Sequence, residues 1–371
     1  MKLKIAVLPG DGIGKEITDQ GVKVLQAIAK KFNHQLTFTT GDIGAVAIEK
    51  TGDPLPDATL EVCRKAEAVL FGAIGDPKYD HDPEAKVRPE QGYLKLRKSL
   101  DLFVNIRPIR VFEGLAHKSP LKATVIKNTD FVILSQPSGG IYFGEKKLTD
   151  NGKTASDSSV YHAEEIDKVA HWAFKFARTR NKKLTLIDKA NMLETSRLWR
   201  KRLQVISKEY PDVNLSFMFI ENASMQLILN PRQFDVILTE AIFGDMLSAS
   251  ASAIAGSVGL SASASIGEKT SLFEPIHGAY VLAKGKNIAN PIATILSAAM
   301  LLEHFELFEE ADSIRNAIDK SIELEITTAD INSSQKFTTT DVGNFIHDFI
   351  IDKKSVLTHI ENISLGQSTI I

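Results

Sequence analysis

The sequence has 371 residues, which is more than one hydrophobic core usually accommodates, so two domains are expected. Hydrophobic residues make up 43% of the chain and charged residues 24%, and a formal net charge of -2 gives no electrostatic basis for binding nucleic acid. The single cysteine, Cys63, excludes an intrachain disulfide and a cysteine-based metal site. Neither a membrane span nor a signal peptide is recognisable in the sequence, so we expect a cytoplasmic protein without a membrane partner.

Short apolar strands alternate with amphipathic helices along the chain. The first strand, predicted over 5–10, is a continuous apolar run that ends in glycine, which is typical of a buried parallel strand. Further strands are predicted over 68–72, 132–134, 184–188 and 234–239, and helices near 15–32, 191–209, 222–230, 245–256, 291–305 and 309–323. This alternation predicts an α/β fold whose functional residues lie near the carboxyl ends of strands.

The glycine-rich turn after the first strand is not a dinucleotide-binding fingerprint. Gly10-Asp11-Gly12-Ile13-Gly14 is followed by Lys15, where the fingerprint requires a final glycine. An acidic ribose partner about twenty residues onward is also absent from the sequence. We therefore interpret the segment as a tight turn that lines a cleft and lets a ligand approach the backbone.

The segment 138–160 departs from the alternating pattern. It is rich in glycine and polar residues and carries little core pattern over a long stretch. Such segments inside compact domains are usually functional or intermolecular. We expect a β-arm that reaches across a dimer interface, and the alternative is a mobile surface hairpin.

An ordered series of motifs runs from residue 1 to about residue 350. The motifs are Gly10-Asp11-Gly12-Ile13-Gly14, Arg88-Pro89-Glu90, Leu96-Arg97-Lys98-Ser99, Asn105-Ile106-Arg107-Pro108, Gly139-Gly140-Ile141-Tyr142-Phe143-Gly144, Asp188-Lys189-Ala190-Asn191, Phe243-Gly244-Asp245, Phe273-Glu274-Pro275-Ile276-His277-Gly278 and Ile288-Ala289-Asn290-Pro291. In identity and order they resemble the 3-isopropylmalate dehydrogenases. These enzymes belong to the β-hydroxyacid oxidative decarboxylases, together with isocitrate and homoisocitrate dehydrogenases.

The resemblance implies a two-domain α/β fold of the isopropylmalate/isocitrate dehydrogenase type, which is not a Rossmann fold. One domain would be discontinuous, with residues 1–103 and 257–371 on the cofactor side. The other, 104–256, would supply the arm near 138–160 and most of the interface of a homodimer with shared active sites.

The resemblance also implies NAD-dependent oxidative decarboxylation of 3-isopropylmalate to 2-oxoisocaproate, a step of leucine biosynthesis, with Mg²⁺ or Mn²⁺ as the metal. The implied catalytic residues are Tyr142, which protonates the enol carbon, and Lys189 of the partner subunit, which handles the hydroxyl proton. The other implied residues are Arg97, Arg107, Glu90 and Leu94 for the substrate, His277, Gly278, Asn290 and Glu274 for the cofactor, and Asp245 and Glu221 for the metal.

Five positions depart from the family pattern. Ser135 stands where a third carboxylate-binding arginine is expected, and losing such a contact costs about 2–5 kcal/mol when its partner stays desolvated. Glu221 replaces an aspartate, and Ala249 removes an oxygen ligand four residues after Asp245 on the same helical face.

The cofactor side is altered as well. Ala241 replaces an asparagine, and Leu282 stands where many NAD-dependent members have an aspartate that binds the adenosine ribose. Three interpretations therefore stay open: a 3-isopropylmalate dehydrogenase with an unusual or slow site, a catalytically inactive or engineered dimeric homologue with an altered pocket, and a related decarboxylating dehydrogenase for a less acidic hydroxy acid.

Overall fold

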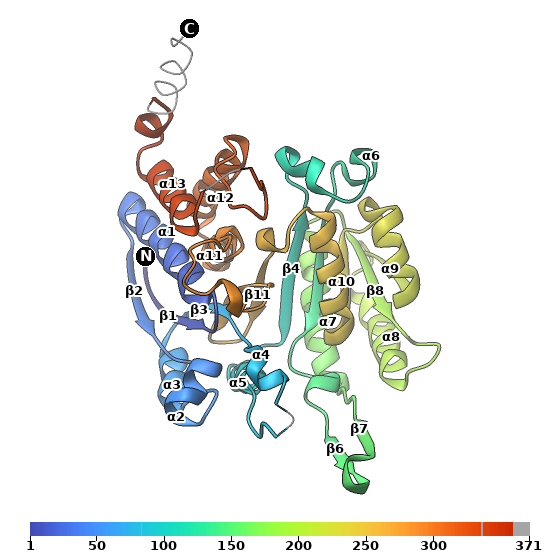
Figure 1. Ribbon diagram of the computed structural model, residues 1–371. Coiled ribbons are helices and arrows are strands. Elements are labelled where there is room, and N and C mark those ends of the chain that lie inside the picture. The colour runs from blue at the N-terminus through green and yellow to red at the C-terminus, as the bar shows by residue number, and fades with distance from the viewer. Residues whose placement is uncertain (83, 335–336, 359–371) are drawn as a thin grey trace.

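The computed structural model describes residues 1–82, 84–334 and 337–358 and has a mixed α/β fold (Figure 1). A ten-stranded sheet runs through it in the order β2-β1-β3-β12-β11-β4-β5-β10-β8-β9. Its strands are β1 (Lys2–Gly10), β2 (Gln35–Thr40), β3 (Ala68–Ala73), β4 (Val104–Arg110), β5 (Asp130–Gln136), β8 (Lys183–Asp188), β9 (Asn214–Phe219), β10 (Val236–Glu240), β11 (Ala262–Ile266) and β12 (Ser271–Pro275). The predicted fold class is confirmed.

The predicted helices are confirmed with ends that differ by a few residues. The α-helices are α1 (Gly14–Phe32), α2 (Ala45–Thr51), α3 (Asp57–Lys65), α4 (Pro77–Asp80), α5 (Pro89–Ser99), α6 (Ala123–Ile126), α7 (Ala163–Arg178), α8 (Glu194–Ile206), α9 (Ile220–Leu229), α10 (Ala241–Ile254), α11 (Ile292–His304), α12 (Phe308–Glu323) and α13 (Thr339–Ile351). Helix α1 forms because Ile17, Leu25 and Ile28 make one buried stripe, and it ends at Phe32, before Asn33, which adopts the left-handed conformation common after helices.

Most neighbouring strands in the large sheet are parallel, but the pairs β12–β11, β11–β4 and β4–β5 at its centre are antiparallel, so β4 has antiparallel neighbours on both sides. It is antiparallel to β11 on one side and to β5 on the other, and Ile106 lies opposite Ala264 and Leu134. The β11–β4 pair therefore joins strands from 104–256 to strands from the two flanking parts of the chain. Figure 1 shows helices α1, α11, α12 and α13 around one part of this sheet and α7, α8, α9 and α10 around the other.

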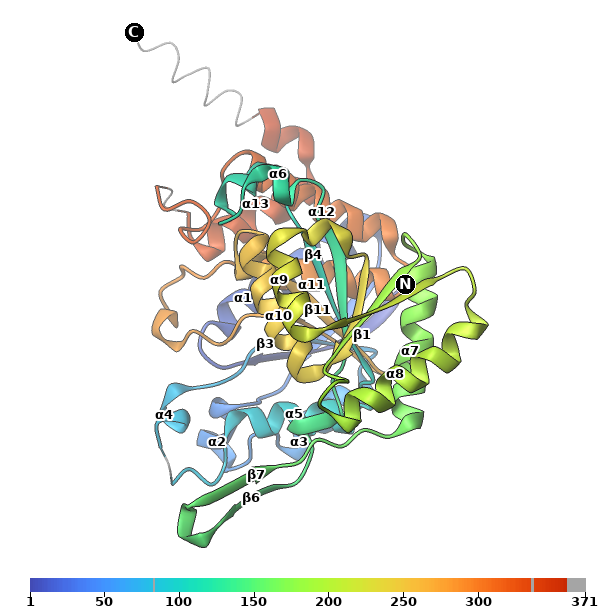
Figure 2. The ribbon, with the colours of Figure 1, turned by 90° about the vertical axis from the view of Figure 1, so that its right-hand side faces the viewer.

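The segment predicted as an arm contains a separate two-stranded antiparallel sheet made by β6 (Lys146–Thr149) and β7 (Thr154–Asp157). All residues of both strands are exposed, including Leu148, whose exposed fraction is 70%. Figure 2 shows this hairpin projecting from the body of the molecule. The segment predicted as a β-arm thus contains paired strands, and its place at a dimer interface stays a prediction.

Across residues 1–82, 84–334 and 337–358, the helices lack the combination of length and apolar character that crossing a bilayer demands.

Candidate active site

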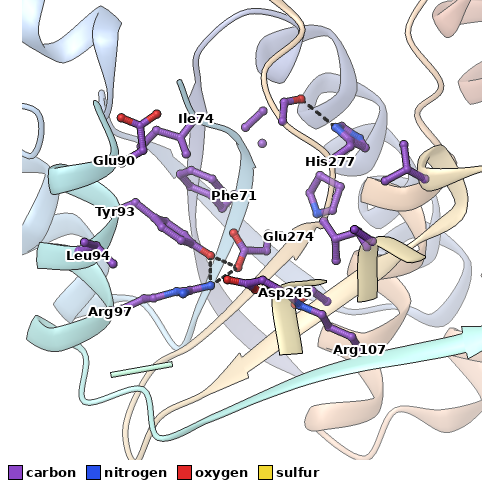
Figure 3. Close-up of a pocket in the computed structure, with 18 of the residues that line it drawn as sticks. Phe71, Ile74, Glu90, Tyr93, Leu94, Arg97, Arg107, Asp245, Glu274 and His277 are labelled. Atoms are coloured by element: carbon purple, nitrogen blue, oxygen red, sulfur yellow. Dashed lines mark hydrogen bonds and ion pairs between the residues drawn. The ribbon is translucent and has the colours of Figure 1, made fainter. Parts of the chain in front are cut away.

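A cavity of about 400 Å³ opens beside the carboxyl ends of β3 and β12 (Figure 3). It brings together most of the residues predicted for substrate, cofactor and catalysis, although they come from distant parts of the chain. Those that line it are Glu90, Leu94, Arg97, Arg107, Tyr142, Asp245, Glu274, His277 and Gly278. A larger cavity of about 980 Å³, between Arg110 and Asp319, contains none of the predicted residues.

Helix α5 supplies the substrate-facing side of the cavity. Pro89 occupies the first turn of the helix, where a missing amide donor has no cost. Glu90, Leu94 and Arg97 follow at spacings of four and three residues, which places them on one helical face. All three line the cavity together with Phe71, which lies in β3, and Ile74, which follows that strand.

Arg97 lies in a buried polar cluster with Tyr93 and Glu274. The Arg97 guanidinium donates to the Tyr93 hydroxyl, and this hydroxyl donates to the Glu274 carboxylate. Burial raises the pKa of Glu274, and the neighbouring Arg97 opposes that shift. Arg97 and Glu274 are only 6% and 7% exposed, so both charges are held away from bulk water.

A second cluster joins Arg107 of β4 to Asp245 of α10. Arg107 Nη2 lies 2.6 Å from Asp245 Oδ1, and the Tyr142 hydroxyl donates to Asp245 Oδ2 at 2.9 Å. Tyr142 belongs to a short 3₁₀ helix, Gly140–Tyr142, that follows β5. Burial, together with the negative charge of Asp245, raises the pKa of Tyr142 well above its usual value. Tyr142 is therefore a neutral phenol at neutral pH and holds a proton that it can donate.

Lys189 and Glu221 lie outside this cavity and contact each other. Lys189 follows β8, Glu221 is in the first turn of α9, and their side chains form an ion pair. Within one chain, therefore, Glu221 faces Lys189, whereas Asp245 faces Arg107. Among the described residues no three acidic, histidine or cysteine side chains gather as a metal-binding group. The predicted pair of metal ligands is thus not assembled within one chain.

The carboxylate at the cavity wall still suits a magnesium or manganese ion whose coordination shell is supplied only in part by the protein. Asp245 offers carboxylate oxygens at the cavity wall, and Ala249 beside it offers none. Magnesium often binds through one or two carboxylates and completes its shell with water or substrate oxygens. Asp245 therefore fits as one ligand of such an ion.

His277 and Asn290 differ in how many hydrogen-bond partners their polar side-chain atoms have within the fold. His277 Nδ1 lies 3.1 Å from the Gly278 carbonyl oxygen, whereas its buried Nε2 has no hydrogen-bond partner among the described residues. Burial lowers the pKa of His277, so a neutral ring with Nε2 as acceptor suits a hydroxyl of a cofactor ribose. Asn290 instead bonds within the fold: its Oδ1 accepts from the Ile292 amide and its Nδ2 donates to Asp330.

The residues that depart from the family pattern occupy different kinds of position. Ala249 lines the cavity, and Ala241 is buried at the start of α10. Ser135 is a buried residue of β5 that packs beside Gly244 of α10 and is not among the cavity-lining residues. Leu282 is 77% exposed, which leaves its apolar side chain in contact with water.

Tyr93 is a cavity residue to which the sequence motifs assigned no role. Its position four residues before Arg97 on one helix is the signal that could have connected the two. Phe71 and Ile74 were likewise not predicted, because an apolar lining residue looks the same in sequence as a core residue.

Comparisons with known proteins agree with the fold and the motifs. Residues 4–346 match the family described as isocitrate/isopropylmalate dehydrogenase. The chain is 50% identical to the 3-isopropylmalate dehydrogenase of Bacteroides fragilis over 352 residues, covering 94% of this chain and 99% of the relative. It is 46% identical to that of Bacillus subtilis over 346 residues, covering 92% of this chain and 94% of the relative.

Solved structures show the same relationship. The isocitrate dehydrogenase of Methylococcus capsulatus is 32% identical with a TM-score of 0.85, covering 94% of this chain and all of that one. A beta-decarboxylating dehydrogenase of Thermococcus kodakarensis is 32% identical with a TM-score of 0.76, covering 94% of this chain and 96% of that one. The predicted resemblance is confirmed, and the chain belongs to the isocitrate/isopropylmalate dehydrogenase family.

Proposed function

We propose that this protein is a decarboxylating dehydrogenase that oxidises 3-isopropylmalate to 2-oxoisocaproate with NAD, as a step of leucine biosynthesis. The observation that carries the proposal is the combination of a buried arginine, Arg97, and a partly buried one, Arg107, with an apolar wall in one cavity. Relatives named 3-isopropylmalate dehydrogenase at 46–50% identity support the same substrate.

The cavity suits a dicarboxylate with a branched apolar side chain. Arg97 and Arg107 both line the cavity, and a guanidinium is the side chain best suited to bind a carboxylate through paired hydrogen bonds. Leu94, Phe71 and Ile74 offer an apolar surface for an isopropyl group. In this proposal Glu90 lies at the edge of that surface and disfavours a further carboxylate there.

Proton transfer divides between two subunits in this proposal. Tyr142 carries the proton that would be delivered to the enol carbon after carbon dioxide leaves. Lys189, which lies outside the cavity of its own chain, would reach the substrate hydroxyl in the cavity of a second copy. A homodimer with shared active sites follows from this assignment.

Exposed apolar side chains support the homodimer. Met225, Ile228 and Leu229 on α9 and Met246 on α10 are each at least half exposed, and clustered apolar surface of this kind marks association sites. The exposed β6–β7 hairpin would add to the interface. We place the domain boundaries at 103/104 and 256/257, with the cavity between the two domains.

The remaining predicted residues are assigned to NAD and the metal ion. We assign His277, Gly278, Asn290 and Glu274 to the cofactor side. Asp245 and the partner's Glu221 would hold Mg²⁺ or Mn²⁺, which when bound supplies Lewis-acid polarisation of the substrate oxygens. Arg107 and Tyr142, which contact Asp245, would then turn to the substrate.

A second candidate is a dimeric homologue without this activity, and the specific observation that favours it is Ala249, which lines the cavity where a further carboxylate is expected. A third is oxidation of a less acidic hydroxy acid, favoured by two arginines in the cavity rather than three.

The experiment that separates these candidates measures NADH formation by the purified protein with manganese and saturating NAD. We expect turnover of 3-isopropylmalate and little of isocitrate or malate; a folded dimer that produces no NADH from 3-isopropylmalate would contradict the proposal.

A further inference from the structure

The Tyr93 ring contacts two other side chains that line the candidate site, Phe71 and Arg97. Its ring centroid is 5.4 Å from that of Phe71, and the Arg97 guanidinium carbon is 4.1 Å from the Tyr93 ring (Figure 3). Because Tyr93 and Arg97 are four residues apart on α5, the helix itself presents the guanidinium to the ring. This cation–π contact holds the Arg97 guanidinium against the ring.

The Tyr93 hydroxyl also lies between two buried groups of opposite charge. A guanidinium can only donate hydrogen bonds and a carboxylate can only accept them, so the hydroxyl accepts from Arg97 and donates to Glu274. Burial holds the pKa of Tyr93 well above its usual value, which keeps the phenol protonated for this double role.

The hydroxyl keeps Arg97 and Glu274 apart. Arg97 Nη2 and Glu274 Oε1 are 3.7 Å from each other, which is longer than a direct hydrogen bond between these groups. Opposite charges attract strongly when little water screens them, and an arginine and a carboxylate favour two parallel direct bonds. With the hydroxyl removed, we expect the two groups to close into such a pair.

We propose that Tyr93 is a positioning residue that keeps the Arg97 guanidinium available for a substrate carboxylate by separating it from Glu274. The inference rests on the proposed function, because it assumes that the cavity receives a dicarboxylate. In that setting, a direct Arg97–Glu274 pair would neutralise Arg97 and turn its donors away from the substrate. Tyr93 thereby sets the affinity for substrate without touching the reacting atoms.

The test measures binding of 2-isopropylsuccinate, which has both carboxylates and the isopropyl group but no hydroxyl to oxidise. Calorimetric titration with manganese and without NAD is expected to show about tenfold weaker binding to Tyr93→Phe, the size of one lost hydrogen bond to a charged group. In turnover assays the same substitution should raise KM by a similar factor and leave kcat nearly unchanged.

Two further variants distinguish a spacer from a packing role. Glu274→Gln removes the competing charge, so it should restore most of the binding when added to Tyr93→Phe and should strengthen binding on its own. Tyr210→Phe is the matched control, because Tyr210 is a buried tyrosine outside the cavity whose hydroxyl lies 3.0 Å from His171 Nδ1. It should leave binding unchanged.

Each outcome bears on a different claim. Equal binding by the unaltered protein and Tyr93→Phe would overturn the role of Tyr93 and leave the proposed function standing. Weaker binding that Glu274→Gln does not restore would overturn the spacer role, since packing alone would then explain the loss. If the unaltered protein does not bind 2-isopropylsuccinate, the proposed function fails and the role of Tyr93 fails with it.

Discussion

Replacing Arg200 with alanine should destabilise the protein substantially, because it leaves a buried carboxylate without its cationic partner. Asp188, at the end of β8, is only 1% exposed, whereas Arg200 on α8 is 28% exposed. Arg200 donates to both oxygens of Asp188, from Nε at 2.7 Å and from Nη2 at 3.0 Å. This bidentate geometry, with two parallel hydrogen bonds, makes arginine–carboxylate pairs strong.

The magnitude follows from what remains after the substitution. Removing one partner of a buried ion pair typically costs about 3–5 kcal/mol. Asp188 would keep its bond from the Ala190 amide at 3.0 Å, and water could enter through the partly exposed space left by Arg200. We therefore expect a loss near the lower end, about 3 kcal/mol in the free energy of unfolding.

Urea unfolding followed by tryptophan fluorescence is a suitable assay, because Trp199 is fully buried on α8 beside Arg200. With a denaturant slope of about 3 kcal/mol per M, the midpoint should fall by about 1 M.

Arg178→Ala provides a matched control. Arg178 makes the same type of bidentate contact with Asp212, from Nη2 to Oδ1 at 2.6 Å and from Nε to Oδ2 at 3.2 Å, and its guanidinium also lies over the Tyr210 ring. Asp212 is 37% exposed, however, so water can solvate it once the arginine is gone. Equal losses of stability in the two variants would refute the argument that burial of the carboxylate sets the cost.

The remaining predictions concern the interface, the altered pocket and pH. Deleting the hairpin 146–157 should shift the dimer towards monomer in sedimentation experiments, and a fully dimeric product would rule out an arm that holds the subunits together. Ala249→Asp, which adds a carboxylate to the cavity lining four residues after Asp245, should raise kcat/KM by about tenfold at subsaturating manganese; an unchanged value would argue against a metal ion at this wall of the cavity. Burial lowers the pKa of His304 below its usual 6.5, so the unfolded chain binds a proton there more readily than the folded chain. The free energy of unfolding should therefore decrease as pH falls through that value, and His304→Gln should make the decrease shallower between about pH 7.5 and about pH 5.5.

Buried parallel strands were the easiest elements to predict. β3 is buried at every position, and its sequence is an almost uninterrupted apolar run. β2 and β11 carry no such signal: β2 is a largely exposed edge strand with threonines, and β11 alternates alanine and serine although all its residues are buried. Helix α7 has an apolar stripe through Ile166, Val169 and Ala173 that makes it predictable, although the predicted set of helices omits it.

The candidate site was predictable as a set of residues and not as a set of contacts. Ordered motifs identified nine of the residues that line the cavity. They gave no means of knowing that Asp245 contacts Arg107 whereas Glu221 contacts Lys189, because those pairings depend on how α9 and α10 lie against the sheet. The spacing of Tyr93 and Arg97 within one helix can be read from the sequence. The contact between Tyr93 and Glu274, which lies on β12, cannot.

The order of strands in the large sheet has a consequence for synthesis on the ribosome. β3 pairs with β1 on one side and with β12 on the other, where Val69 lies opposite Leu272. While residues 104–256 are being made, the second edge of β3 has no neighbour, and its side chains are apolar throughout. An unpaired apolar edge is a template for aggregation. The nascent chain therefore depends on its inserted segment folding quickly, or on a chaperone covering β3, until β12 emerges and closes the sheet.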